Sequence, residues 1–334
     1  MTTALAPHRP EPAGPRRAHA AVPARHVAGP WDRLRALPAR LGPGTTVDDA
    51  TVAAVAAEPL LPATTRGALA RFRADPGPAG ALLLRGLPLG AVPATPPHPT
   101  APSGKDLVSE LLLLAVALEL GEPVGYRPEH GGALVQNLLP VRATAATQTS
   151  TSSSVDLEFH TETAFHPHRP HHLLLSCLRG DARAQTHLCS IRELLDDLGE
   201  PTRRTLAEPR FRTRVDESFG GTPDQEPGPA APVLRGDLRR PTLVFDAELM
   251  TAVDPEAADA LDALRALATA RRTSLVLVPG DLLVVDNHTC IHGRSAFAAR
   301  YDGTDRWLQR SFVVDDLTPS AAERDGRIID TVRG

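Results

Sequence analysis

Cysteine, aromatic side chains and long apolar runs are scarce in this chain of 334 residues. Its three cysteines, Cys177, Cys189 and Cys290, lie far apart, without the Cys-x-x-Cys pairs of a thiolate zinc site or the density of a disulfide framework. The longest apolar run, residues 111–118, is far shorter than the ~20 residues that span a bilayer. The sequence therefore predicts a protein of the reducing cytoplasm with no membrane partner.

A surplus of positive charge is also missing. The chain carries 36 basic and 40 acidic side chains, a net charge of −4, so it offers no basic stripe for the phosphates of a nucleic acid. Residues 1–30 are rich in Pro, Ala and Arg but lack the continuous apolar stretch of a secretory signal. We expect them to form a disordered tail, with an Arg-rich transit peptide as the alternative.

The remainder, residues 31–334, is predicted to be a single α+β domain. Helical patterns cover residues 63–74, 105–120, 190–198 and 254–271. Strand patterns cover residues 155–163, 172–178, 242–245, 274–278, 282–286 and 306–314. Helices come early and strands late without steady alternation, which favours an antiparallel sandwich or barrel as the core. A Pro- and Gly-rich stretch at about 220–240 is the predicted active-site lid.

One predicted strand places a histidine and a glutamate two residues apart. In VDLEFHTET, residues 155–163, His160 and Glu162 share one face, whereas Phe159 points to the other. A strand that turns His and Glu inward lines a polar cavity and supplies two ligands of a metal site. An isolated His-x-Glu occurs by chance in many proteins and is not by itself a metal site. Two ligands on one strand also span only part of a coordination sphere, so a third ligand has to come from elsewhere.

His292 is the best third ligand. It follows the turn and apolar strand of residues 280–287 and lies in Ile291-His-Gly-Arg294. Two imidazoles and one carboxylate form the facial triad of non-haem Fe(II) oxygenases, which leaves positions open for substrate and O₂. The alternatives are a hydrogen-bonded structural histidine, or a zinc hydrolase or cupin-like metalloenzyme with the same three ligands.

Two arginines follow His292. Arg306 and Arg310 share one face of the predicted strand and lie roughly 13 Å apart at about 3.3 Å per residue. Inward-facing arginines require anions, and a planar guanidinium suits carboxylates. We expect one arginine to bind the distal carboxylate of 2-oxoglutarate and the other a carboxylate of the substrate. A strand whose arginines meet water is the alternative.

With these motifs the chain resembles a known family. LEFHTETAFHPHRP (residues 157–170), CLRGD (177–181), HGRS (292–295) and RYDGTDRW (300–307) are similar to the clavaminate synthase-like Fe(II)/2-oxoglutarate oxygenases of the TauD/TfdA-like superfamily. This group includes arginine and asparagine β-hydroxylases of peptide-antibiotic pathways. The resemblance covers roughly residues 107–316 and implies a double-stranded β-helix (jelly-roll) core flanked by helices.

The resemblance also implies a role for each site residue. The residues that match the iron ligands are His160, Glu162 and His292. The implied 2-oxoglutarate contacts are Arg306, for the distal carboxylate, and Thr186. The implied substrate contacts are Arg310, for the α-carboxylate, together with Asp246, Ser150 and Gln136.

These residues together predict a dioxygenase that uses Fe(II), 2-oxoglutarate and O₂ to hydroxylate C3 of an L-amino acid in specialised-metabolite (antibiotic) biosynthesis. Asp246 with Glu248 argues for a polar or cationic side chain, so arginine-like substrates are favoured over amides. Alternatives within the family are an amino acid tethered to a carrier protein, and desaturation or cyclisation. A non-catalytic barrel that acts as a binding module is the alternative from another class.

Overall fold

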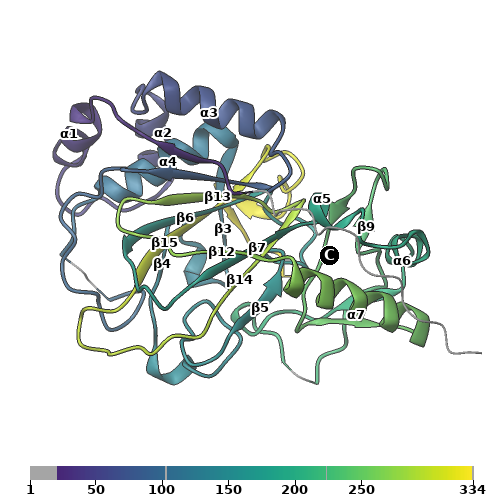
Figure 1. Cartoon of the computed structure of the whole chain (residues 1–334). Coiled ribbons are helices and arrows are strands. Elements are labelled where there is room, and N and C mark those ends of the chain that lie inside the picture. Colours follow the sequence, from purple (N-terminus) through teal and green to yellow (C-terminus); the bar gives the residue numbers. More distant parts are fainter. Residues whose placement is uncertain (1–20, 102–103, 223, 333–334) are drawn as a thin grey trace, which may run out of the picture.

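Two β-sheets lie face to face at the centre of the fold (Figure 1), in a computed structural model that describes residues 21–101, 104–222 and 224–332. Within these residues the larger sheet has the strand order β1-β2-β13-β6-β15-β3-β17-β16, with β4 also paired to β15. The smaller sheet has the order β12-β7-β14-β5. Most pairs are antiparallel, but β1 pairs with β2, and β17 with β3, in parallel.

The strands have the following bounds. The larger sheet contains β1 (Ala24–His26), β2 (Ala81–Arg85), β3 (Glu122–Tyr126), β4 (Gln136–Leu138), β6 (His172–Arg179), β13 (Leu282–Asp286), β15 (Trp307–Val314), β16 (Arg324–Asp325) and β17 (Ile328–Ile329). The smaller sheet contains β5 (Leu157–His160), β7 (Thr186–Ser190), β12 (Thr273–Leu275) and β14 (Cys290–Arg294). Two separate pairs are β8 (Phe211–Thr213) with β11 (Met250–Ala252), and β9 (Leu234–Arg235) with β10 (Thr242–Leu243).

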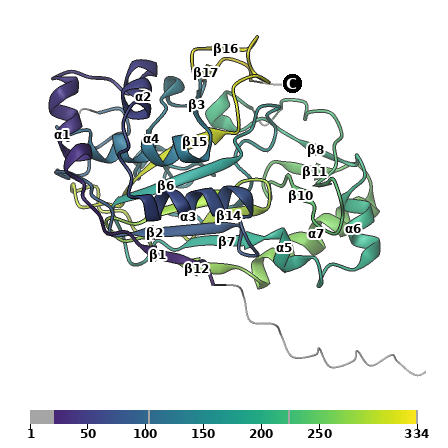
Figure 2. The same ribbon diagram turned by 90° about the horizontal axis from the view of Figure 1, so that it is seen from above.

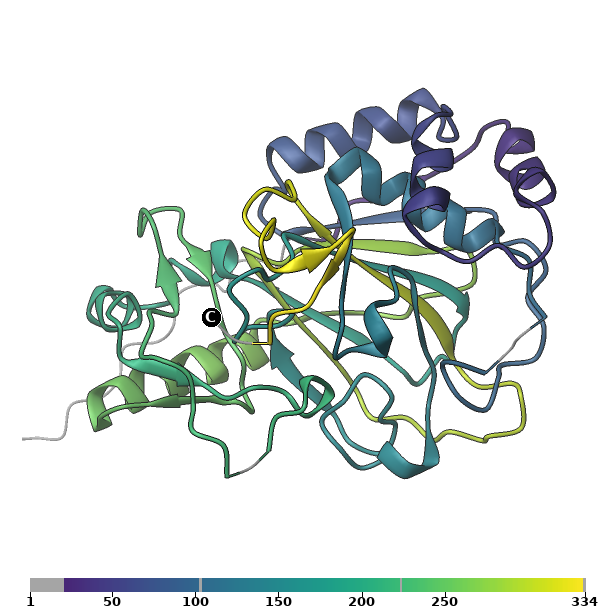
Figure 3. The same ribbon diagram turned by 180° about the vertical axis from the view of Figure 1, so that it is seen from behind.

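Helices cover the outer faces of both sheets (Figures 1 and 3). The layer on the larger sheet consists of α1 (Asp32–Leu41), α2 (Asp49–Ala56), α3 (Ala63–Ala74) and α4 (Val108–Leu120). The other side of the molecule carries α5 (Ile191–Leu194), α6 (Glu200–Leu206) and α7 (Pro255–Ala270), and Figure 2 shows α6 and α7 beside β8, β10 and β11. Short 3₁₀ turns lie at His130–Gly132, Arg142–Thr144 and Glu217–Phe219.

Alternating residues of the central strands divide the core into layers. In β13, Leu282 and Val284 pack with α4, whereas Leu283 and Val285 pack between the two sheets. Helix α4 is apolar on every side because it lies between the larger sheet and the other N-terminal helices, and Leu111 through Leu114 are fully buried. In β14, Cys290 faces the space between the sheets and Ile291 the cluster around α7. The same alternation turns His292 inward.

Several sequence predictions can be compared directly with these elements. The helix at 63–74 and the strand at 282–286 have the predicted bounds, and the Asp254 side chain caps α7 by accepting the Ala257 N–H at 3.0 Å. The helix expected at 190–198 ends already at Leu194, although Ser190 does cap it by accepting the Arg192 N–H. Helices α1, α2 and α6 were not predicted.

Two further predictions concern the N-terminal tail and the absence of membrane-spanning segments. Residues 1–20 lie outside the described residues, whereas Ala24–His26, also assigned to the tail, form strand β1 against Leu83–Arg85 of β2. Backbone pairing to a buried strand therefore orders a segment whose composition predicts disorder. Within the described part of the chain, no helix is long and apolar enough to cross a membrane.

Candidate metal centre and active-site cavity

His160 and His292 are cross-strand partners at the end of the smaller sheet. Strand β14 runs antiparallel to β5, with His292 opposite His160, and their ring centroids lie 4.3 Å apart. In a regular antiparallel ladder Arg294 would then lie opposite Glu158. Instead the register shifts and Arg294 lies opposite Leu157, so β5 contains a bulge. Pairing between two strands 130 residues apart in sequence thus brings the two imidazoles together.

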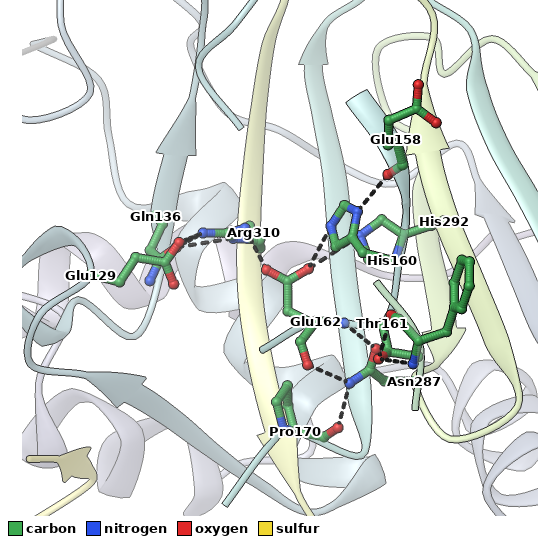
Figure 4. Close-up of polar contacts among 11 residues, drawn as sticks. Glu129, Gln136, Glu158, His160, Thr161, Glu162, Pro170, Asn287, His292 and Arg310 are labelled. Carbon is green, nitrogen blue, oxygen red and sulfur yellow. Dashed lines mark hydrogen bonds and ion pairs between the residues drawn. The ribbon is translucent and has the colours of Figure 1, made fainter. Parts of the chain in front are cut away.

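Glu162 comes from the turn that follows β5. The strand ends at His160, and Thr163 has a positive φ of 49°, so the predicted strand through Thr163 is wrong in its last residues. Nevertheless Glu162 Oε2 lies 3.1 Å from His292 Nε2 and 3.8 Å from His160 Nε2 (Figure 4). The potential ligand atoms of these three residues all lie within 4.8 Å of one another, as the sequence predicts for a facial triad.

Neighbouring groups orient these ligands. His160 Nδ1 lies 2.8 Å from the Glu158 carbonyl oxygen, to which it donates, so Nε2 is left for a metal ion. Asn287 is fully buried and holds the backbone of Glu162: its Oδ1 accepts the Glu162 N–H at 2.7 Å, and its Nδ2 donates to the carbonyl oxygens of Glu162 at 3.1 Å and Pro170 at 2.9 Å (Figure 4).

The donor set fits a divalent metal ion. Glu162 Oε2 is buried and accepts no geometrically satisfactory hydrogen bond from the described residues, although it faces two imidazole nitrogens. Burial alone would raise the pKa of Glu162, but Arg310 and the two histidines lower it to about 2. Burial, with His160 beside it, lowers the pKa of His292 to about 4. At neutral pH the glutamate is therefore ionised and His292 neutral, the states that bind a metal.

Arg310 is the centre of a buried polar cluster next to the triad. Its Nη1 donates to Glu162 Oε1 at 2.7 Å, and its Nη2 forms an ion pair with Glu129 (Figure 4). Burial opposes the charge of Arg310, but Glu129 and Glu162 raise its pKa above the ordinary value. Burial raises the pKa of Glu129. Glu129 was not predicted, because it lies in a loop outside every motif of the sequence.

Gln136 lies behind Arg310. It pairs with Arg310 across β4 and β15, and its Oε1 accepts hydrogen bonds from Arg310 Nε at 3.0 Å and Nη2 at 2.6 Å. Gln136 is not among the residues that line the cavity. The structure therefore gives it a contact with an arginine where the sequence predicted a contact with the substrate.

A cavity of about 770 Å³ opens in front of the triad. Besides the three metal-ligand candidates, it brings together the other predicted site residues Arg306, Arg310, Thr186, Ser150 and Asp246. Segment 214–222 forms one wall. The predicted lid at about 220–240 therefore borders two cavities. Gly221 and Thr222 border this one, whereas five later residues line a second cavity: Gly228, Pro229, Ala231, Pro232 and Arg235.

Arg306 and Thr186 lie in this cavity, and the described residues provide neither an ion pair for the arginine nor a hydrogen bond for the hydroxyl. Burial lowers the pKa of Arg306 to about 10, and no carboxylate of the described residues forms an ion pair with it. The Thr186 hydroxyl is buried without a hydrogen-bond partner, and Thr186 lies opposite Arg294 in the smaller sheet. Burial also lowers the pKa of Arg294, to about 9, and its Nη2 donates to Ser152 Oγ at 2.9 Å. Buried cations next to an unsatisfied hydroxyl require an anionic ligand.

Asp246 faces the triad from the other side. Burial raises its pKa, against the effect of His160, with which it forms an isolated β-bridge. Its Oδ1 accepts the backbone N–H groups of Glu248 at 2.9 Å and Leu249 at 2.7 Å. These bonds fix the direction of the carboxylate, so that Asp246 enters the cavity in one orientation.

Comparison with known proteins shows the family of the chain. Residues 79–312 match the family described as taurine catabolism dioxygenase TauD, TfdA family. The chain is 42% identical over 276 residues to an L-asparagine oxygenase from Streptomyces coelicolor, covering 80% of this chain and 81% of that protein. It is 40% identical over 260 residues to an L-lysine 3-hydroxylase from Catenulispora acidiphila, covering 75% of this chain and 72% of that protein.

Solved structures give the same result. An asparagine oxygenase in complex with Fe(II), 2S,3S-3-hydroxyasparagine and succinate superposes with a TM-score of 0.85 at 38% identity, covering 92% of this chain and 99% of that chain. The non-haem iron oxygenase OrfP in complex with Fe and alpha-ketoglutaric acid gives 0.82 at 29% identity, covering 92% and 100%. The chain therefore belongs to the TauD/TfdA family, as an Fe(II)- and 2-oxoglutarate-dependent oxygenase related to the amino-acid hydroxylases.

Proposed function

We propose that this enzyme hydroxylates C3 of a free L-amino acid with a basic side chain, such as arginine, lysine or ornithine, in the biosynthesis of a specialised metabolite. The observation that carries the choice of side chain is the charge of the cavity. Among the described residues, seven carboxylates but only four arginines line it: Glu129, Glu158, Glu162, Asp216, Glu217, Asp246 and Glu248, against Arg214, Arg294, Arg306 and Arg310.

The charges of the bound groups leave this surplus in place. Fe(II) and 2-oxoglutarate carry opposite charges of equal size, and the α-carboxylate and α-ammonium of an amino acid also cancel. The excess of carboxylates therefore acts on the substrate side chain, and in a partly dehydrated cavity it favours a cation over a neutral amide. Asp246, already oriented by two backbone N–H groups, is the carboxylate proposed to face it.

Each end of the substrate has a matching group. We assign the α-carboxylate to Arg310 and the α-ammonium to Glu129, since both are buried beside Glu162. Gln136 then positions Arg310 from behind, and Ser150 contributes a hydroxyl at the rim of the cavity. Arg306 and Thr186 are assigned to the distal carboxylate of 2-oxoglutarate, which would satisfy the buried cation and the free hydroxyl.

When bound, Fe(II) with 2-oxoglutarate and O₂ supplies an oxidant that hydroxylates an unactivated C–H bond. The residues His160, Glu162 and His292 would hold the metal at one point. The protein selects the carbon by position, because the Arg310–Glu129 pair fixes the α-carbon next to the triad and leaves C3 as the nearest side-chain carbon.

The proposal extends to three features of the fold. We infer that the two facing sheets form a jelly-roll core, in accord with the family. We also infer that the segment at about 220–240 acts as a lid, since its first residues border the cavity. One oxygenase domain in the cytoplasm would then comprise β1 together with residues 31–334, and the predicted tail would end before β1, with its first twenty residues beyond the described part.

A substrate panel tests the proposed function. Purified enzyme with Fe(II), ascorbate and 2-oxoglutarate is incubated with arginine, lysine, ornithine, asparagine or glutamine, and succinate and the hydroxylated product are measured, with the position of the new hydroxyl determined by NMR. We expect turnover with a basic amino acid at C3 and none in H160A. A preference for asparagine would refute the basic side chain, and activity restricted to aminoacyl thioesters of a carrier protein would refute the free substrate.

A further inference from the structure

A second cavity lies on the other side of the segment that follows Glu162. It has a volume of about 450 Å³, within the ~300–1,000 Å³ that is usual for small-molecule sites. Ala164 and Phe165 line both cavities, so the two share a wall. None of Arg294, Arg306 and Arg310 borders the second cavity. It is therefore separate from the groups assigned to 2-oxoglutarate and to the substrate.

Two arginines that form no ion pair with the described residues line this second cavity. Arg169 lies in the segment after β5, and Arg235 ends β9. The Arg169 Nε atom is buried and has no hydrogen-bond partner, and the described residues provide no ion pair for either guanidinium. Burial, with Arg235 nearby, lowers the pKa of Arg169 to about 10. Two half-buried guanidinium groups repel each other, so this arrangement is stable only if an anion or solvent offsets their positive charge.

Histidines supply further donors around the same space. His171 and His288 line the cavity with their rings 4.2 Å apart. Burial lowers the pKa of His288 to about 3, so at neutral pH its imidazole is uncharged and keeps one N–H to donate. His171 Nε2 is 3.4 Å from Asp315. Asp316 is the only carboxylate among the described lining residues, so the two guanidinium groups leave the cavity with a positive excess.

Arg169, Arg235 and His288 provide these donors. They come from three separate parts of the fold, namely the segment after β5, strand β9 and the loop between β13 and β14. A carboxylate is planar and is satisfied by one guanidinium, whereas a phosphate has tetrahedral oxygens that accept from several directions. Phe165, Phe211 and Met250 provide apolar wall next to the cations, so there is room for an organic group as well.

We propose that this second cavity is a binding site for a phosphate group, held by Arg169 and Arg235 with His288 as an additional donor. The group would come from inorganic phosphate or from a phosphate ester whose organic part lies on Phe211 and Met250. The site is independent of the amino-acid substrate assigned to the active site.

Calorimetric titration tests the site. The full chain, saturated with Fe(II) and 2-oxoglutarate under argon so that the active-site cations are occupied, is titrated with inorganic phosphate and, separately, with pantetheine 4′-phosphate. We expect saturable binding of at least one probe, and the tighter probe identifies the source of the phosphate. R235Q should weaken this binding at least tenfold.

R239Q is the matched control, because Arg239 lies four residues further on and its exposed side chain pairs only with Asp237 in the described structure. It should bind the probes as the unmodified chain does. If R235Q does not retain its melting temperature and 2-oxoglutarate affinity, R169Q provides the same comparison. The proposal is overturned if neither probe binds saturably, or if the cavity variants bind as tightly as R239Q.

Discussion

Replacing Asn287 with alanine tests whether the support of the Glu162 backbone is part of the metal site. The side chain is fully buried and makes three hydrogen bonds, two to Glu162 and one to Pro170. Its removal frees the turn that carries the carboxylate ligand and leaves the Glu162 N–H without its acceptor. The expected result is a loss of Fe(II) affinity that exceeds the effect of the lost stability alone.

The magnitude follows from these contacts. Each hydrogen bond contributes about 1 kcal/mol net, and each buried group left unsatisfied costs about 1–3 kcal/mol. N287A should therefore lower the free energy of unfolding of the metal-free chain by about 3–5 kcal/mol, a large part of the ~5–15 kcal/mol typical of a domain. Loss of support to a metal ligand typically weakens metal binding ~10–100-fold.

Asn137 offers a matched control. It also makes three hydrogen bonds, donating to the Pro99 carbonyl oxygen and accepting from Trp307 Nε1 and Gln309 Nε2, but it contacts no metal-ligand candidate. Urea denaturation gives the stability of N287A and N137A, and anaerobic competition of Fe(II) against a chromophoric chelator gives their metal affinity. Equal Fe(II) affinity in the two variants would refute the reasoning, since Asn287 would then support the fold alone.

Three further predictions concern the cofactor, the strand register and pH. R306Q should weaken 2-oxoglutarate binding ~10–100-fold while Fe(II) still binds, because it removes a charge-assisted contact; unchanged 2-oxoglutarate affinity in a titration contradicts this. In G293A the new Cβ would lie 2.6 Å from the Leu157 carbonyl oxygen and separate β14 from β5, so Fe(II) affinity should fall. In helix α3, by contrast, the new Cβ of G67A would meet only Arg71 Nη1 at 3.5 Å, so this variant should leave Fe(II) affinity unchanged. Burial lowers the pKa of four histidines in the folded chain, to about 4 for His130, His172 and His292 and to about 3 for His288. A histidine of the unfolded chain has a pKa of ~6.5. The unfolded chain then binds more protons, so the free energy of unfolding of the metal-free protein should fall from pH 6.5 towards pH 4, by up to ~1.4 kcal/mol per histidine and pH unit; equal urea midpoints at pH 7 and pH 5 would contradict this.

Local patterns explain what the sequence predicted correctly. Alternation along a strand turns His292 and Arg310 inward whatever the partner strands are, so their chemistry could be inferred before the topology was known. Asp254 followed by Pro255 marks the start of α7 through contacts within four residues. The mixed helix-and-strand class and the three metal-ligand candidates were predicted from such short-range signals, although Glu162 lies in the turn after β5 and not on the strand.

Long-range contacts explain what the sequence could not predict. Glu129 becomes part of the site only because it meets Arg310, 181 residues away, and nothing in its own loop indicates that partner. The positive φ of Thr163 ends β5 early, although threonine ordinarily favours extended backbone. Likewise, strand β1 forms because the edge of β2 is available for pairing, and the composition of residues 21–30 gives no indication of that partner.

The bulge between β5 and β14 has a consequence for how this enzyme can change in evolution. Because His160 pairs with His292 while Leu157 pairs with Arg294, one side of the ladder contains a residue more than the other. Removing the extra residue from β5 would keep His160 opposite His292 and Leu157 opposite Arg294, but would take away the bend that a bulge introduces. Substitution of the exposed Glu158 leaves that count unchanged. A change in the number of residues in β5 could therefore alter the direction in which His160 is presented while every metal-ligand candidate stays the same.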